Sequence, residues 1–236
     1  MLVLWDVDHT LLNAGGGSAH LYGVVFRELF GRELPWVAPM AGRTDRAIVL
    51  ETLTGSGVSE PGLHVEAFLA GLTTRAPGIG VLVAERGRAL PGAAAALAAV
   101  AAVAGQDGQR AVQSVLTGNV RALAEVKLGT LGLASHLDLD IGAYGDHHEV
   151  RAELVHLARR NAALAYQRDF AGLATVLVGD TPLDIAAARQ GGARSVGVAT
   201  GATSATKLAA AGADAVLPDL TDTASVLAAI LGQRAG

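Results

Sequence analysis

Two acidic side chains, Asp6 and Asp8, directly follow a short apolar run at residues 2–5. The run suits a buried parallel strand, and the carboxyl edge of such a strand is where open α/β sheets bind their ligands. Side chains alternate along a strand, so both carboxylates leave the same face, and like charges that close require a cation or a shared proton. A strand that ends in a solvated acidic turn is the alternative interpretation.

A second acidic cluster repeats this arrangement near the other end of the chain. The apolar run 176–178 leads through Gly179 to Asp180, and Asp184 follows one helical turn later. The pattern is again an apolar strand, an aspartate and the start of a helix. Asp184 suits a place near a bound cation, and it equally suits a carboxylate that stabilises the first turn of its own helix.

A third apolar segment, residues 112–116, ends in Thr117, Gly118 and Asn119, where we expect a helix to begin. The threonine hydroxyl and the backbone N–H groups that follow it could hold the oxygens of a phosphoryl group. The alternative is a helix N-cap, a position in which threonine is common.

Taken together, these segments resemble the haloacid dehalogenase-like hydrolase superfamily. Its first motif, DxDxT, matches residues 6–10, and its last motif, GDxxxD, matches residues 179–184. Its middle motif is a strand that ends in Thr or Ser, which matches Thr117. The resemblance covers nearly the whole chain and is closest to the branch with a helical cap that contains phosphoglycolate phosphatase-like proteins.

The resemblance implies a role for each acidic residue. Asp6 would attack phosphorus and carry an aspartyl-phosphate, while Asp8 would protonate the leaving oxygen and later deprotonate water. Mg²⁺ would be held by Asp6, the main-chain carbonyl of Asp8 and Asp180, with Asp184 in its second coordination shell or bound through water. Thr117 and the backbone of Gly118 and Asn119 would bind the phosphoryl oxygens.

The positive charge that neutralises the phosphoryl group departs from the common family pattern, which has a lysine before the last motif. At the matching place the chain carries Arg151, and we predict that arginine serves the same purpose because its charge is permanent and its geometry is bidentate. Lys127 is the second candidate. Ten residues of helix after Thr117 would place it roughly 15 Å along the axis and away from the site.

Two further residues are candidates for substrate specificity. His9 occupies a place in the first motif where many family members have glycine, and it is equally well explained as a tolerated turn residue. Arg43 belongs to the segment Gly42-Arg43-Thr44-Asp45, which resembles a turn that capped members use near the substrate. An exposed arginine on a helical surface is the alternative there.

The composition excludes several classes of protein. None of the 236 residues is cysteine, which excludes disulfides, thiolate nucleophiles and sulfur-ligated metals. The net charge is −4, lysine occurs only at positions 127 and 207, and no basic face for nucleic acid is expected. The longest apolar run, residues 93–104, is too short to cross a bilayer. The first strand leaves no room for a leader, so we expect a cytoplasmic protein with no membrane partner.

The order of elements predicts an α/β protein with a doubly wound parallel sheet, a Rossmann-like core and an inserted α-helical cap. Residues 19–88 show helical segments only, whereas helices and strands alternate from residue 90 onward. The domains would be a core of residues 1–18 and 89–236 and a cap of residues 19–88. The expected later strands are the segments 111–116, 137–143, 174–178, 195–198 and 215–217.

These expectations lead to one principal function and two alternatives. The first is a Mg²⁺-dependent phosphatase that hydrolyses a small phosphorylated metabolite through an aspartyl-phosphate. A phosphomutase acting on a sugar phosphate would use the same aspartates, and a non-enzymatic phosphate-binding protein could share the fold. The sequence predicts no oligomeric state.

Overall fold

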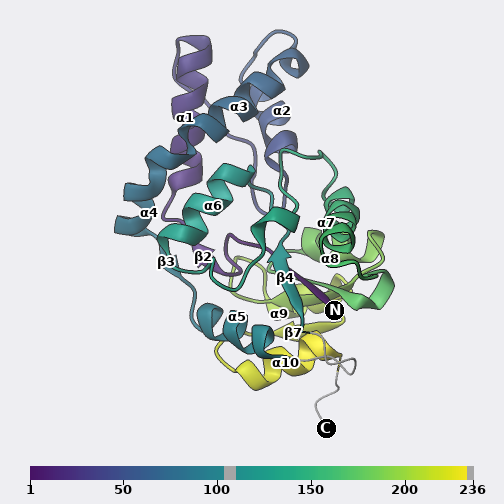
Figure 1. The fold of residues 1–236 in the computed structure, drawn as a ribbon. Coiled ribbons are helices and arrows are strands. Elements are labelled where there is room, and N and C mark those ends of the chain that lie inside the picture. Colours follow the sequence, from purple (N-terminus) through teal and green to yellow (C-terminus); the bar gives the residue numbers. More distant parts are fainter. Residues whose placement is uncertain (104–109, 233–236) are drawn as a thin grey trace.

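The computed structural model describes residues 1–103 and 110–232, and its core is a five-stranded parallel sheet (Figure 1). The order of the strands is β4-β1-β5-β6-β7. Their bounds are Leu2–Trp5 for β1, Val112–Val115 for β4, Thr175–Gly179 for β5, Arg194–Val198 for β6 and Ala215–Leu217 for β7. The predicted parallel α/β core is confirmed. Strand β1 lies between β4 and β5 and pairs with both.

Both faces of the sheet are buried, which explains why β1 is apolar throughout. Val3 and Trp5 pack into one hydrophobic cluster, and Leu2 and Leu4 pack into the other. The first cluster includes residues of α5 (Ala93–Ala102), α6 (Arg121–Thr130) and α10 (Thr223–Leu231). The second includes residues of α7 (Arg151–Tyr166) and α8 (Pro182–Gln190), while α9 (Ala205–Ala210) packs on β6 and β7.

The insertion after the first strand is helical, and we refer to residues 19–88 as the cap. It contains α1 (Gly17–Phe30) except for its first two residues, together with α2 (Asp45–Gly55), α3 (Val65–Arg75) and α4 (Gly80–Arg86). There are 3-10 turns at Pro61–His64 and Ala76–Ile79. The chain enters through β2 (Leu12–Asn13) and leaves through β3 (Arg88–Ala89), which pair antiparallel. A two-stranded ribbon therefore joins the cap to the core.

The cap packs closely on the core. Helices α3 and α4 and the turn Ala76–Ile79 contact α6 of the core, above the sheet in Figure 1. One hydrophobic cluster extends from Trp5 in the sheet through Leu123 in α6 to Phe68 in the cap. Helix α6 thus lies between the sheet and the helices of residues 19–88.

The cap contains one long apolar stretch of helices. Residues Pro61–Arg86 are long and apolar enough to cross a membrane by length and composition, and 33% of their most apolar window is buried inside the structure. Buried Leu72 and Val83 belong to the shared cluster with the core. Core helices of soluble proteins meet the same criteria, so this stretch is no evidence for a membrane.

One predicted element differs from the structure. The strand expected at 137–143 is wrong, because Leu139–Ile141 form a 3-10 turn and only Ala143 makes a β-bridge, to Leu116. Asp138 accepts a hydrogen bond from the backbone of Asp140, which favours the turn over an extended chain. The helix expected near residues 120–131 is observed as α6, Arg121–Thr130.

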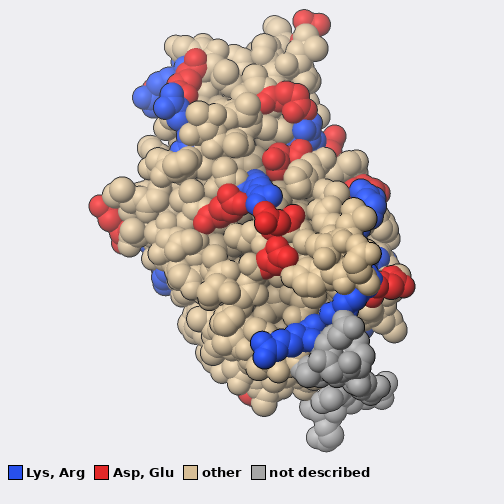
Figure 2. Space-filling view, in the orientation of Figure 1, with Lys and Arg blue, Asp and Glu red and all other residues tan. Residues whose placement is uncertain are grey.

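Charged side chains of both signs are mixed over the surface. On the upper part of the face in Figure 2, basic groups lie mostly beside acidic ones. Exposed ion pairs such as Arg27–Glu33 and Arg121–Asp140 are of this kind, and pairs in water contribute little to stability. The buried ion pairs at the ends of the strands are therefore more informative about function than these exposed pairs.

Candidate active site

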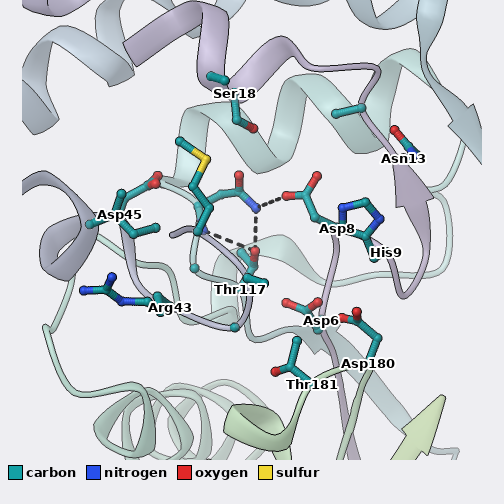
Figure 3. Close-up of a pocket in the computed structure, with 18 of the residues that line it drawn as sticks. Asp6, Asp8, His9, Asn13, Ser18, Arg43, Asp45, Thr117, Asp180 and Thr181 are labelled. Atoms are coloured by element: carbon teal, nitrogen blue, oxygen red, sulfur yellow. Dashed lines mark hydrogen bonds between the residues drawn. The ribbon is translucent and has the colours of Figure 1, made fainter. Parts of the chain in front are cut away.

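The carboxyl edge of the sheet brings the three predicted segments together. Asp6 and Asp180 directly follow β1 and β5, and Thr117 lies two residues after the end of β4. All three side chains line one cavity of about 280 Å³ (Figure 3). The β1–β4 and β1–β5 pairings hold these strand ends side by side. Asp8 lines the same cavity two residues beyond Asp6.

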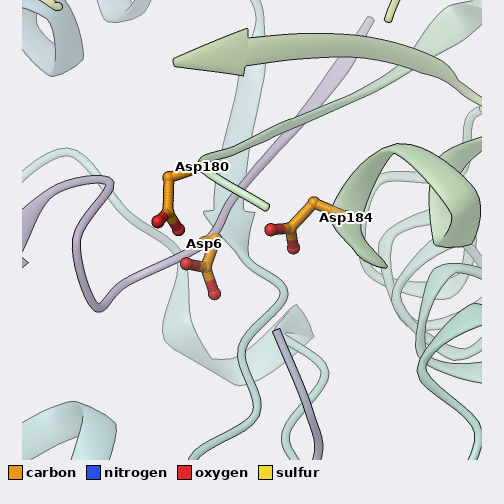
Figure 4. Close-up of side chains that lie close together, drawn as sticks. All are labelled: Asp6, Asp180 and Asp184. Carbon is orange, nitrogen blue, oxygen red and sulfur yellow. The ribbon is translucent and has the colours of Figure 1, made fainter. Parts of the chain in front are cut away.

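Three buried carboxylates meet at this edge (Figure 4). One oxygen from each of Asp6, Asp180 and Asp184 lies within 4.8 Å of the others. Thr10, the last residue of the first motif, donates to Asp6 at 3.3 Å and to Asp180 at 3.5 Å through its hydroxyl. Burial and then the charge of Asp184 raise the pKa of Asp180 to about 7, and the same two causes raise the pKa of Asp6 well above its usual value.

This donor set suits a hard divalent cation. All three groups offer oxygen only, and burial and then the charge of Asp184 raise the pKa of Asp6 and of Asp180. Asp184 has less freedom than the other two. Its Oδ2 accepts hydrogen bonds from the backbone N–H and the hydroxyl of Thr181, which form a capping box at the start of α8. These contacts agree with the alternative interpretation, in which Asp184 stabilises the first turn of its own helix. Asp6 and Asp180 remain the better direct ligands.

Arg151 lies directly against the nucleophile candidate. Its Nη2 is 2.7 Å from Asp6 Oδ1 and 2.6 Å from Asp184 Oδ1, and it also donates to the carbonyl of Leu116 at 3.3 Å. The guanidinium is almost entirely buried, because α7 begins at this residue and points its first turn at the strand ends. A phosphoryl group bound at Asp6 would therefore contact this charge.

Lys127 also reaches the site, and here the sequence-based placement is wrong. Its Nζ lies 2.6 Å from Asp8 Oδ2 and 2.7 Å from Asn119 Oδ1, and the side chain is fully buried. Because α6 begins at Arg121, Lys127 is only about 9 Å along its axis, and long side chains on a helix point back toward the N-terminus. Both candidate cations therefore lie in the site, Arg151 against Asp6 and Lys127 against Asp8.

Asn119 connects the phosphate-loop candidates to Asp8. Its side-chain amide donates to Asp8 Oδ2 at 2.8 Å and to Thr117 Oγ1 at 2.7 Å, while its carbonyl oxygen accepts from Lys127. Burial raises the pKa of Asp8, but the charge and hydrogen bonds of Lys127 and the bond from Asn119 outweigh it and hold the pKa below its usual value. Asn119 therefore orients Asp8 through its side chain, a role that the motif did not predict.

The cap contacts the same loop from above. The backbone N–H of Asp45 donates to the carbonyl of Gly118 at 2.6 Å, and its carboxylate accepts from the N–H of Val120 at 2.7 Å. A side chain at Gly118 would collide with the backbone of Arg43, so this close approach requires glycine. Thr44 donates to the carbonyl of Glu149. The start of α2 thus docks on two loops of the core.

The two specificity candidates from the sequence line the cavity with different roles. Arg43 is paired with Glu51 at 2.6 Å and donates to the carbonyl of Pro39. His9 is exposed and has a φ of 62°, a left-handed conformation that favours glycine. Sequence reasoning missed Asp45, which stands two residues after Arg43 and is buried in the cavity wall.

Comparison with known proteins agrees with the fold. The model of the haloacid dehalogenase-like hydrolase family matches residues 3–189. The chain therefore belongs to this family of hydrolases, as its motifs predicted. A search of the curated proteins by sequence finds no match.

Solved structures of similar fold cover almost the whole chain. A haloacid dehalogenase-like hydrolase from Streptococcus pneumoniae is 16% identical, covers 96% of each chain and has a TM-score of 0.61. A protein described as a predicted phosphatase, from Clostridium acetobutylicum, is 16% identical, covers 96% of this chain and 97% of its own, and has a TM-score of 0.64. A protein assigned as a beta-phosphoglucomutase, from Bacteroides vulgatus, is 15% identical, covers 98% and 89%, and has a TM-score of 0.63. At these identities the likeness shows the fold.

Proposed function

We propose that the protein is a Mg²⁺-dependent phosphatase that hydrolyses a small phosphorylated metabolite through an aspartyl-phosphate on Asp6. The observation that carries this proposal is the place of Asp6, buried at the end of β1 with Asp180 on one side and Arg151 on the other. A carboxylate oxygen there can attack phosphorus while the guanidinium neutralises the phosphoryl oxygens. The residues 1–18 and 89–236 would form the catalytic core and residues 19–88 the cap.

The metal would be held by Asp6, the main-chain carbonyl of Asp8 and Asp180, with Asp184 behind them. Mg²⁺ bound there would supply positive charge that offsets the carboxylates and the phosphoryl oxygens. That charge would oppose the effects of burial and of Asp184, which raise the pKa of Asp6 and of Asp180. The carboxylate of Asp6 would then be ionised and able to act as the nucleophile.

Asp8 would move the proton in both halves of the reaction. In the first half it gives a proton to the leaving oxygen as the bond between that oxygen and phosphorus breaks. In the second it takes a proton from the water that attacks the aspartyl-phosphate. Lys127 and Asn119 favour the ionised form needed for the second half. A phosphate dianion that enters beside Asp8 raises its proton affinity for the first half.

The remaining donors would bind the phosphoryl group. The hydroxyl of Thr117 and the backbone of Gly118 and Asn119 lie at the end of β4, facing the cavity. The closed cap would exclude water during phosphoryl transfer, since the start of α2 docks on these residues. The cytoplasmic location expected from the sequence stays a prediction.

The test is the release of inorganic phosphate from a panel of phosphate monoesters, with Mg²⁺ and with a chelator. We expect release that requires Mg²⁺ and a phosphorylated peptide containing Asp6 after acid quenching. Asp6→Asn should reduce the rate by roughly a thousandfold or more, because an amide is a poor nucleophile. If Asp6→Asn retained more than about a tenth of the activity, the nucleophile would have to be another group.

A phosphomutase is the second candidate, because one of the similar structures is assigned as a beta-phosphoglucomutase. Such an enzyme would transfer the phosphoryl group from Asp6 to another hydroxyl of a sugar phosphate and release little phosphate. Product analysis separates the two functions, since an isomerised sugar phosphate without phosphate release supports the mutase. Binding of phosphate esters without turnover would support the non-enzymatic alternative.

A further inference from the structure

The part of the cavity that faces the cap would receive the leaving group of the substrate. Its wall is made of small and apolar side chains, among them Ala14, Ser18, Met40 and Ile48. At about 280 Å³ the whole cavity is at the lower end of the range for ligand sites. After a phosphoryl group is placed beside Asp6, the space left suits a leaving group of a few carbon atoms.

Asp45 gives this part of the cavity a fixed negative charge. Its Oδ1 accepts from the hydroxyl of Tyr22 at 2.7 Å and its Oδ2 accepts from the N–H of Val120 at 2.7 Å, so the carboxylate cannot turn away. Burial raises the pKa of Asp45 to about 6, and those hydrogen bonds limit the rise. The charged form therefore predominates above neutral pH. Asp8 adds a second carboxylate nearby.

The positive groups around the cavity are already neutralised. Among the described residues that line it, the only lysine or arginine side chains are Arg43 and Arg151. Arg151 is held by Asp6 and Asp184. Arg43 is held by Glu51, and in Figure 3 its guanidinium points away from the carboxylates of the site.

From this balance of charge we infer that the substrate is a small phosphate monoester whose leaving group carries no second anionic group. The alcohol would be neutral or bear an amine, with a hydroxyl or ammonium donor that can approach Asp45. A carboxylate or a second phosphate in that position would face Asp45 with no free cation to balance it. The inference names the substrate class of the proposed phosphatase and rests on that function.

Three esters with the same two-carbon skeleton test this directly. 2-Hydroxyethyl phosphate ends in a hydroxyl, phosphoethanolamine in an ammonium and phosphoglycolate in a carboxylate. At pH 7.5 with Mg²⁺, we expect kcat/KM for the first two to exceed that for phosphoglycolate by about tenfold or more. Equal values, or a preference for phosphoglycolate, would overturn the inference.

Two variants in the cap identify the source of the preference. Asp45→Asn removes the charge and retains an acceptor, so it should reduce the difference between the neutral and the carboxylate ester to about threefold or less. Glu51→Gln leaves Arg43 without its anionic partner and should raise kcat/KM for the carboxylate ester relative to the neutral one. Glu85→Gln, an exposed glutamate on α4, is the matched control and should leave all ratios unchanged. If Asp45→Asn does not fold, Glu51→Gln and the three esters still decide.

Binding measurements separate a failure of this inference from a failure of the proposed function. If neither these esters nor p-nitrophenyl phosphate is hydrolysed, the phosphatase proposal fails. Titration calorimetry of the three esters with the same protein and Mg²⁺ then decides the charge preference. A Kd for phosphoglycolate at least about tenfold weaker than for 2-hydroxyethyl phosphate supports the inference, and equal or tighter binding overturns it. Hydrolysis of p-nitrophenyl phosphate without the charge preference would overturn the inference and leave the phosphatase intact.

Discussion

Two buried cations serve the two aspartates of the first motif, and they reach the site in different ways. Arg151 starts α7 at the sheet edge and bonds Asp6, while Lys127 lies in the second turn of α6 and reaches back to Asp8. The side chain of Asp6 is 10% exposed and that of Asp8 is 33% exposed. The proposed nucleophile is therefore held in a water-poor site, whereas the proposed proton shuttle remains accessible to water.

Because Arg151 and Lys127 lie in different positions, the two cations can act on different groups. Arg151 bridges two carboxylates and stands where a phosphoryl group would bind, so its charge can act on the reacting atoms. Lys127 contacts Asp8 and Asn119 and does not line the cavity, so it acts through Asp8. We therefore expect loss of Arg151 to cost more activity than loss of Lys127.

Removal of Arg151 should give the larger effect of the two. Arg151→Ala is expected to lower kcat/KM by an amount equivalent to about 2–5 kcal/mol of lost transition-state stabilisation, because a charged donor is lost from a site that excludes water. Steady-state kinetics on protein shown to be folded by circular dichroism measures this. Arg160→Ala, an exposed arginine on the same helix, should change the rate little. A near wild-type rate for Arg151→Ala would move the phosphate-binding charge to another residue.

Removal of the charge of Lys127 should give an intermediate effect. Lys127→Met keeps most of the side-chain volume and leaves Asp8 without its cation, so we expect a loss of about 1–3 kcal/mol in kcat/KM. Slow leaving groups should suffer most, because the change acts on proton transfer. Lys127→Arg should restore part of the rate, and Lys207→Met on α9 is the control. A larger loss than for Arg151→Ala would reverse the comparison and assign the phosphate contact to Lys127.

The cap contributes a third buried charge, Asp45, whose effect should appear in stability. Its folded pKa of about 6 lies above the usual aspartate value of 3.8, so the folded state binds more protons between those values. The free energy of unfolding should therefore rise as pH falls from about 6 to about 4, and stay at its lower level above pH 6. Asp45→Asn removes this dependence.

Denaturant unfolding of wild type and Asp45→Asn across this range measures the effect. We expect the difference between the two proteins to change by about 1–3 kcal/mol between pH 4 and pH 7, with the wild type gaining at low pH. The exposed Asp169 provides the control substitution Asp169→Asn. A difference that is constant with pH would show that Asp45 is ionised at no cost.

The smallest effect should come from the loop that carries both aspartates. His9 holds a left-handed conformation, with a φ of 62°, between Asp8 and Thr10. His9→Gly should raise the free energy of unfolding by about 0.5–1 kcal/mol, because glycine adopts this conformation without strain. The thermal midpoint measures it. A decrease in stability would mean that the imidazole makes contacts worth more than the strain.

Prediction from the sequence worked best where the chemistry follows directly from a strand. Apolar runs that end in Asp6, Thr117 and Asp180 predicted three strands with polar residues at their ends, and the sheet order places these strands side by side. Prediction failed where an alternating pattern of apolar and polar residues is compatible with both a strand and a turn. The segment 137–143 alternates like a strand, yet Asp138 stabilises a turn there.

The sequence by itself determined the family, the parallel core and the edge at which the carboxylates gather, because strand periodicity and strand direction are local properties. Only the tertiary structure decided which partners these groups have. It brings Lys127 to Asp8 by the start and direction of α6, and it brings Asp45 to Val120 by closing the cap on the core. Contacts of this kind depend on how helices far apart in the chain are oriented, and no spacing within one segment specifies that orientation.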